Sequence, residues 1–228
     1  MKKLAVFIVC VFLFLAAGVT AYAAQDGTAY YVDAVCGNDE NDGTSPDCAW
    51  KTMSRASQNE FAPGDSLLLK RGQVFGGNFM TNGSGSENAP VVFSAYGDGA
   101  APVIHAEKGE FIFVLQNVSH WVVENLELTS DDYGVIIVAH SGEDIEDITV
   151  RNCYFHDISP DETDSSHSAL LINNERGKSR MKNIHLDSLR IENVAWGVHT
   201  NGTNAENDRK LFISPEESYN RDYLFENI

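Results

Sequence analysis

The sequence predicts an all-β solenoid, a stack of short coils in which equivalent strands lie side by side. Two observations predict it. One apolar–polar alternation with a fixed polar position recurs along the chain, and turn-rich segments of unequal length separate its copies. The four copies are WVVENLEL at 121–128, ITVRNCYF at 148–155, IHLDSLRI at 184–191 and YLFENI at 223–228.

The fixed position, here called the rung position, holds asparagine three times and serine once. Its residues are Asn125, Asn152, Ser188 and Asn227, separated by 27, 36 and 39 residues. Unequal gaps fit a constant coil that carries loops of different length. Asparagine is a poor strand former, but identical side chains stacked in register form a ladder whose amides hydrogen-bond along the stack. We therefore predict a structural role for this position, at a bend between strands.

Each coil is predicted to contain two strands. The first is the stretch around the rung position, and the second is an apolar run at 111–117, 133–139, 168–173 or 196–202. Five coils rising about 4.8 Å each would stand roughly 24 Å high. The last copy stops just past Asn227, so we expect a solenoid truncated at its C-terminal end, the front part of a longer protein. Its open last coil would be available for self-association.

The composition excludes one class of partner. The 228 residues include 16 basic and 33 acidic side chains, a formal net charge of −17. A chain this acidic, without a basic stripe, is not expected to bind nucleic acid. A polyanionic ligand would need local Lys or Arg, or a bridging cation, to offset the negative field.

Residues 1–23 have the three parts of a secretory signal peptide. Lys2 and Lys3 precede an apolar run at 4–19, and small residues at 21–23 follow it. We predict cleavage after Ala23 and a secreted or periplasmic protein. The apolar run is shorter than the roughly 20 residues of a membrane-spanning helix, so no membrane anchor is expected after cleavage.

Three cysteines follow the predicted cleavage site. Cys36 and Cys48 lie in a turn-rich loop and are predicted to form a disulfide, as an oxidising compartment permits. Cys153 occupies the same position in its copy as Leu126 and Leu189, which predicts a small buried hydrophobic side chain. No CxxC pair suggests a cysteine-bound metal.

Three further segments carry a resemblance to a known group of proteins. They are YYVDAVCGNDENDGTSPDCAWKTM at 30–53, FAPGDSLLLKRGQVFGG at 61–77 and NAPVVFSAYGDGAAPVI at 88–104. Together with the rung repeats, they resemble the pectate-lyase-like superfamily of secreted right-handed parallel β-helix proteins, over residues 29–228. The resemblance implies a right-handed parallel β-helix with an N-terminal capping helix at 49–59. Residues 24–105 would form the cap and first strands, and residues 106–228 the coils.

The resemblance also implies a carbohydrate-active protein, the N-terminal part of a polysaccharide lyase or a glycoside hydrolase that binds an extended polysaccharide along the coils. Fold does not determine the reaction, so lyase and hydrolase both stay open. A non-catalytic glycan-binding or surface adhesion module is the alternative.

Candidate site residues lie in the loops between the first and second predicted strands. These loops are TSDDYG at 129–134, HDISPDETDSSHS at 156–168 and ENVAWG at 192–197, and stacking in register would bring them to one edge. The candidate catalytic residues are Asp131, Asp132, Asp157 and His167, and the candidate substrate-binding residues are Trp196, His199 and Arg176.

Three interpretations of the acidic loops compete. Clustered carboxylates could bind Ca²⁺, the one cofactor we consider, and the cation would acidify the α-proton of a uronate. Two carboxyl groups could instead catalyse glycoside hydrolysis. The third interpretation is a solvated acidic loop on an acidic protein.

Overall fold

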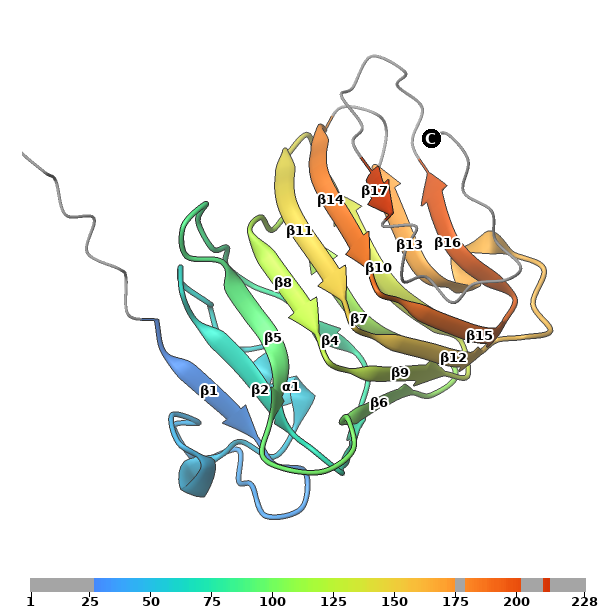
Figure 1. The fold of residues 1–228 in the computed structure, drawn as a ribbon. Helices are drawn as coiled ribbons and strands as arrows, with labels where there is room; N and C mark the ends of the chain where they lie inside the picture. The colour runs from blue at the N-terminus through green and yellow to red at the C-terminus, as the bar shows by residue number, and fades with distance from the viewer. Residues whose placement is uncertain (1–26, 175–178, 202–210, 214–228) are drawn as a thin grey trace, which may run out of the picture.

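The computed structural model describes residues 27–174, 179–201 and 211–213. The strands of successive coils stack along one axis and form three parallel sheets, as in a right-handed parallel β-helix (Figure 1). Among these residues, no helix has both the length and the apolar character needed to cross a bilayer.

Sheet 1 is the seven-stranded sheet at the front of Figure 1. In spatial order its strands are β1 (Ala29–Val32), β2 (Ser66–Lys70), β5 (Val91–Tyr96), β8 (Trp121–Glu124), β11 (Ile145–Arg151), β14 (Met181–Asp187) and β17 (Leu211–Ile213). Sheet 2 comprises β4 (Phe79–Met80), β7 (Phe111–Gln116), β10 (Tyr133–Ala139), β13 (Ser168–Asn174) and β16 (Trp196–Asn201). Sheet 3 comprises β3 (Val74–Gly76), β6 (Val103–Ala106), β9 (Glu127–Ser130), β12 (Tyr154–Ile158) and β15 (Arg190–Val194).

Each of the five complete coils, from β2–β4 to β14–β16, contributes one strand to every sheet, whereas β1 and β17 have no counterparts in sheets 2 and 3 among the described residues. A complete coil therefore contains three strands, and the prediction of two was wrong. The segment ITVRNCYFHDI holds the end of β11 and all of β12. The chain turns between them at Asn152, whose φ of 51° lies in the left-handed region. A bend of one residue leaves the alternation of apolar and polar side chains almost unbroken, which is why two strands read as one.

The predicted bend at the rung position is confirmed. Asn125 and Ser188 also have positive φ, 62° and 51°. Asparagine enters the left-handed region more readily than other residues with a side chain, which explains its recurrence there. The side-chain amide of Asn125 donates to Ser94 Oγ of the neighbouring coil at 3.1 Å, so its partner in the stack is a serine. Asn227 lies outside the described residues.

The interior is one continuous apolar column. Trp121, Ile148 and Ile184 occupy equivalent places on successive strands of sheet 1 and are all buried. Burying each such side chain contributes about 1.5–3 kcal/mol. Cys153 is buried as predicted, and burial raises the pKa of its thiol to about 12.

A short helix lies at the N-terminal end of the stack. The helix α1 (Met53–Ala56) is a single turn, shorter than the predicted 49–59, and Thr52 caps it by accepting a hydrogen bond from the Arg55 amide. Trp50 and Phe61, on either side of the helix, are buried. The Phe61 ring meets Trp121 edge-on at 5.4 Å, so aromatic side chains cover the first coils.

The predicted disulfide is not formed, because Cys36 and Cys48 are both free and exposed. Cys48 ends the 3₁₀ turn η1 (Pro46–Cys48). Backbone hydrogen bonds close the loop instead: the Asn38 amide donates to Ala49 O at 3.0 Å, and the Gly43 amide donates to Cys48 O at 3.0 Å. These bonds hold the loop while both thiols face solvent.

Candidate functional site

The outer face of sheet 3 carries a dense set of polar and aromatic side chains. On β9, β12 and β15, alternate residues point inward, and Leu128, Phe155 and Ile191 are buried. The residues between them lie on the outer face, as the strand period of two requires. They include Glu127, Tyr154, His156, Arg190 and Glu192.

His156 connects two carboxylates on this face. Its Nδ1 lies 2.8 Å from Asp157 Oδ2, and its Nε2 lies 3.0 Å from Glu127 Oε1 of the preceding coil. The imidazole is 18% exposed, whereas the Asp157 side chain is 60% exposed. The carboxylate of Asp157 is therefore accessible to solvent, whereas the histidine that contacts it is largely buried.

Asp157 is stabilised as an anion. The side-chain amide of Asn193 donates to its Oδ1, and this bond, followed by the bond from His156, lowers the pKa of the Asp157 carboxyl. Asp157 and Asn193 have φ values of 51° and 49°, so they form a second column of left-handed residues. Asp157 is thus charged at neutral pH.

Tyr154 is surrounded by polar neighbours. Its ring stacks on His156 with centroids 4.4 Å apart, and the Arg190 guanidinium lies 4.3 Å from the ring centroid. Its hydroxyl donates to Glu192 Oε2 at 2.9 Å. Burial, then the bond to Glu192, raises the pKa of Tyr154, so the phenol stays protonated at neutral pH.

The structure brings two predicted catalytic residues together. His167, at the end of the 3₁₀ turn η2 (Ser165–His167), places Nε2 2.7 Å from Asp132 Oδ1 of the preceding coil. The other carboxylate oxygen of Asp132 accepts the Gly109 amide at 2.7 Å, and the Ser159 hydroxyl donates to Asp132 O at 2.7 Å. Tyr133 stacks on the imidazole at 4.5 Å. The side chains of His167 and Asp132 are both largely buried. This pair, here called the loop clamp, attaches loop 159–167 to the segment after β9 in the preceding coil.

The other predicted residues are spread along the same edge. Asp131 is 64% exposed, with His105 Nε2 3.7 Å from its Oδ2. Trp196 begins β16, is 40% exposed and meets His199 edge-on at 6.3 Å. Arg176 lies outside the described residues. The loops after β9, β12 and β15 do leave the same edge of sheet 3, as predicted.

A groove of about 420 Å³ runs beside this face, along the bend between sheets 1 and 3. Glu127, Tyr154 and Arg190 line it from three successive coils, and Arg71 lines it from an earlier one. The groove also contains the rung residues Asn125, Asn152 and Ser188. The groove therefore runs along the stacking direction, and it shares Glu127, Tyr154 and Arg190 with the outer face of sheet 3.

Sequence reasoning missed the strand residues Glu127, Tyr154 and Arg190, and it placed His156 in a loop rather than on β12. The available signal was the period of two. After each rung, a polar residue alternates with a buried one, and polar residues in equivalent places of successive coils must meet on the outside.

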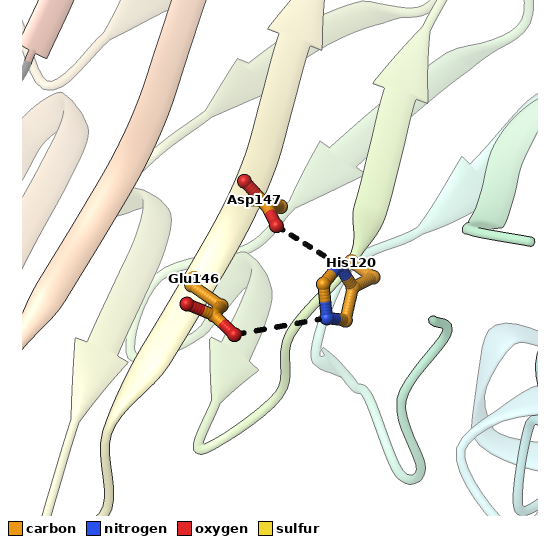
Figure 2. A group of neighbouring side chains, drawn as sticks. All are labelled: His120, Glu146 and Asp147. Carbon is orange, nitrogen blue, oxygen red and sulfur yellow. Dashed lines mark ion pairs between the residues drawn. The ribbon is translucent and has the colours of Figure 1, made fainter. Parts of the chain in front are cut away.

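The sequence predicts metal ligands among the carboxylates of the loops. In the part of the chain that the structure describes, three such groups converge at His120, Glu146 and Asp147 of sheet 1, away from those loops (Figure 2). Ca²⁺ binding by the acidic loops stays a prediction.

The comparisons with known proteins agree with this fold. No family model matches the chain. It is 28% identical over 199 residues to a lacto-N-biosidase of Bifidobacterium longum subsp. longum, covering 61% of this chain and 12% of that protein. It is 39% identical over 62 residues to alpha-1,3-galactosidase A of Akkermansia muciniphila, covering 27% of this chain and 10% of that protein.

Among solved structures, the GH136 lacto-N-biosidase of Eubacterium ramulus superposes with a TM-score of 0.62 at 23% identity. The match covers 72% of this chain and 34% of that one. The chain is thus a parallel β-helix protein related to carbohydrate-active β-helix proteins, which confirms the resemblance inferred from the sequence. It spans about one-eighth of the first curated relative's length.

Proposed function

We propose that this chain is part of a glycoside hydrolase and that its glycan lies on the outer face of sheet 3. The observation that carries the proposal is the ionised, exposed Asp157 supported by His156, Glu127 and Asn193, beside a groove that crosses several coils. The names of both curated relatives describe glycosidases, which favours a hydrolase over a lyase.

Asp157 and Asp131 are the best candidates for the two carboxyl groups of glycoside hydrolysis. Asp131 directly follows β9 and Asp157 lies on β12, the neighbouring strand of sheet 3, and both side chains are more than half exposed. Two carboxyl groups that flank the scissile bond are what glycoside hydrolysis requires. Asp157, charged at neutral pH, would stabilise or attack the anomeric carbon, and Asp131 would donate a proton to the leaving oxygen. The loop clamp of Asp132 and His167 would position loop 159–167 beside them.

The relatives suggest the substrate. A lacto-N-biosidase acts on glycans that contain lacto-N-biose, so the proposed substrate is an oligosaccharide with that disaccharide or a terminal galactose. Trp196, at the same edge, offers an exposed indole for stacking on a sugar ring.

The test is a panel of p-nitrophenyl glycosides, including the lacto-N-bioside and the galactosides, together with polysaccharides. Reducing ends and the ultraviolet absorbance of unsaturated uronates are measured, with Ca²⁺ added or removed by EGTA. We expect reducing ends without unsaturated product. Asp157→Asn and Asp131→Asn should each lower kcat/KM by at least about 100-fold, a typical minimum for a catalytic acid or base. Asp161→Asn, an exposed carboxylate in the same loop, is the matched control. Unsaturated product would replace the proposal with a lyase.

A non-catalytic glycan-binding module is the second candidate, favoured by the exposed Trp196 and the open groove. It predicts retarded migration in glycan-containing gels without product, and loss of retardation in Trp196→Ala. Retention of binding in that variant would argue against this indole as the contact.

A further inference from the structure

Three potential metal ligands from two neighbouring coils converge on sheet 1 (Figure 2). His120 immediately precedes β8, and Glu146 and Asp147 lie on β11, the next strand of the sheet. His120 Nδ1 is 3.1 Å from Asp147 Oδ2, and its Nε2 is 4.0 Å from Glu146 Oε1. One ligand atom of each residue lies within 4.8 Å of the other two. The histidine side chain is only 17% exposed.

The next coil orients both carboxylates. The side-chain amide of Asn183 donates to Asp147 Oδ1 at 2.8 Å, and Lys182 Nζ lies 3.8 Å from Glu146 Oε2. Each carboxylate thus has one oxygen held by β14 and the other turned toward His120. Outer contacts of this kind orient the ligands of metal sites.

His120 belongs to a column of left-handed residues. His120, Asp147 and Asn183 occupy equivalent places in successive coils and have φ values of 58°, 56° and 52°. Asparagine, aspartate and histidine are all enriched in this conformation, so the bend accepts each of them. What distinguishes His120 is that its imidazole faces two carboxylates of the next coil, and imidazole with carboxylates is a ligand set for a transition-metal ion.

We propose that His120, Glu146 and Asp147 bind a divalent transition-metal ion of the Zn²⁺ type, with water in the remaining position. Three protein ligands and one open position are a common Zn²⁺ arrangement. The imidazole favours Zn²⁺ over Ca²⁺ and Mg²⁺, which prefer oxygen ligands. The ion would join two coils of sheet 1. The site goes beyond the proposed function, because it lies on a different sheet from the proposed glycan face.

Co²⁺ is the probe, because its visible absorption reports coordination by protein ligands. Titration of the purified protein should give one saturable Co²⁺ equivalent that Zn²⁺ displaces. His120→Asn, which still accepts a left-handed φ, and Asp147→Asn should each weaken binding by at least tenfold. Lys182→Gln should strengthen binding, because it removes the cation that competes for Glu146. Glu143→Gln, an exposed acid in the preceding turn, should leave binding unchanged.

The proposal fails if no saturable Co²⁺ spectrum forms, or if His120→Asn binds Co²⁺ as the parent does, since an adventitious surface ion would then account for it. A metal-dependent rise in the melting temperature of the parent protein provides a second measurement if a variant folds poorly. Absence of that rise in the parent would equally contradict the site. Glycosidase activity is a separate result, because neither outcome of the Co²⁺ titration depends on it.

Discussion

At the scale of single residues, the fold depends on polar side chains with defined hydrogen-bonding tasks. Asp33 illustrates this at the end of β1. Its carboxylate, 3% exposed, accepts bonds from the Cys36 amide at 2.8 Å and from the Gln73 side chain at 2.8 Å, and it contacts Lys70 Nζ at 2.6 Å. Burial opposes ionisation, but the hydrogen bonds from Cys36, Lys70 and Gln73 outweigh it and hold the pKa of Asp33 far below its usual range.

The low pKa of Asp33 predicts acid sensitivity. A carboxyl whose pKa is depressed by folding stabilises the protein above its unfolded-state pKa of about 3.9 and loses that contribution as the pH falls below it. Asp33→Asn should therefore lower the free energy of unfolding by about 1.5–3 kcal/mol at pH 7, the typical value of a hydrogen bond to a charged group. Urea unfolding at pH 7 and pH 3 measures this, and an equal difference at both pH values would contradict it.

The rung residue Asn125 offers a test of backbone conformation. With φ at 62°, alanine at this position should cost about 1–2 kcal/mol, the usual penalty of the left-handed region. Glycine carries no such penalty, so Asn125→Gly should be more stable than Asn125→Ala even though both lose the bond to Ser94. Thermal unfolding of the two variants measures this difference in stability. A more stable alanine variant would mean that the left-handed conformation does not explain the asparagine at this position.

At the scale of elements, the regular strands and the loops were predictable to different degrees. The alternation around Asn125 and Asn152 located two stacked coils and their register, because buried positions must repeat in every coil. The bend itself was placed correctly, but β11 and β12 were merged, since a one-residue turn does not interrupt the pattern. Asp132 and His167 were both predicted to lie at the same edge, and the structure places them in contact. The contacts of His156 were not predictable, because they depend on side-chain directions that a sequence pattern does not contain.

The loop clamp predicts how loop 159–167 behaves. Asp132→Asn removes the charge opposite His167 and exchanges one acceptor oxygen for an amide, so the loop should open more often. Amide hydrogen exchange in 159–167 should accelerate, while exchange in β11 stays unchanged. Tyr133→Leu, which removes only the stacking partner of the imidazole, is the milder comparison. Uniform acceleration across both segments would indicate global destabilisation instead.

At the scale of the whole molecule, charge and packing act in opposite directions. One apolar column runs through the coils, from Val32 on β1 to Ile191 in the last complete coil described. The whole chain carries a formal net charge of −17, and the excess of like charges is mutually repulsive. The thermal stability of the protein should therefore depend on ionic strength.

Raising NaCl from low concentration to 1 M shortens the screening length from roughly 30 Å to about 3 Å. We expect the melting temperature to rise over this range, because screening weakens the repulsion among the 33 acidic side chains more than it weakens buried contacts. Calorimetry in NaCl and in KCl separates screening from specific cation binding. A falling melting temperature would show that surface ion pairs such as Arg180–Asp144 outweigh the repulsion.

The order of strands in sheet 1 follows the order of the chain, from β1 to β17 without a reversal. Every new coil therefore adds to an edge that earlier residues have already built. A chain with this order can acquire structure progressively while it is still being synthesised, with the aromatic side chains around α1 assembled before the polar face of sheet 3 exists. The direction of synthesis would then coincide with the direction of growth of the stack, and each strand of sheet 1 would pair with the strand that precedes it in this sheet.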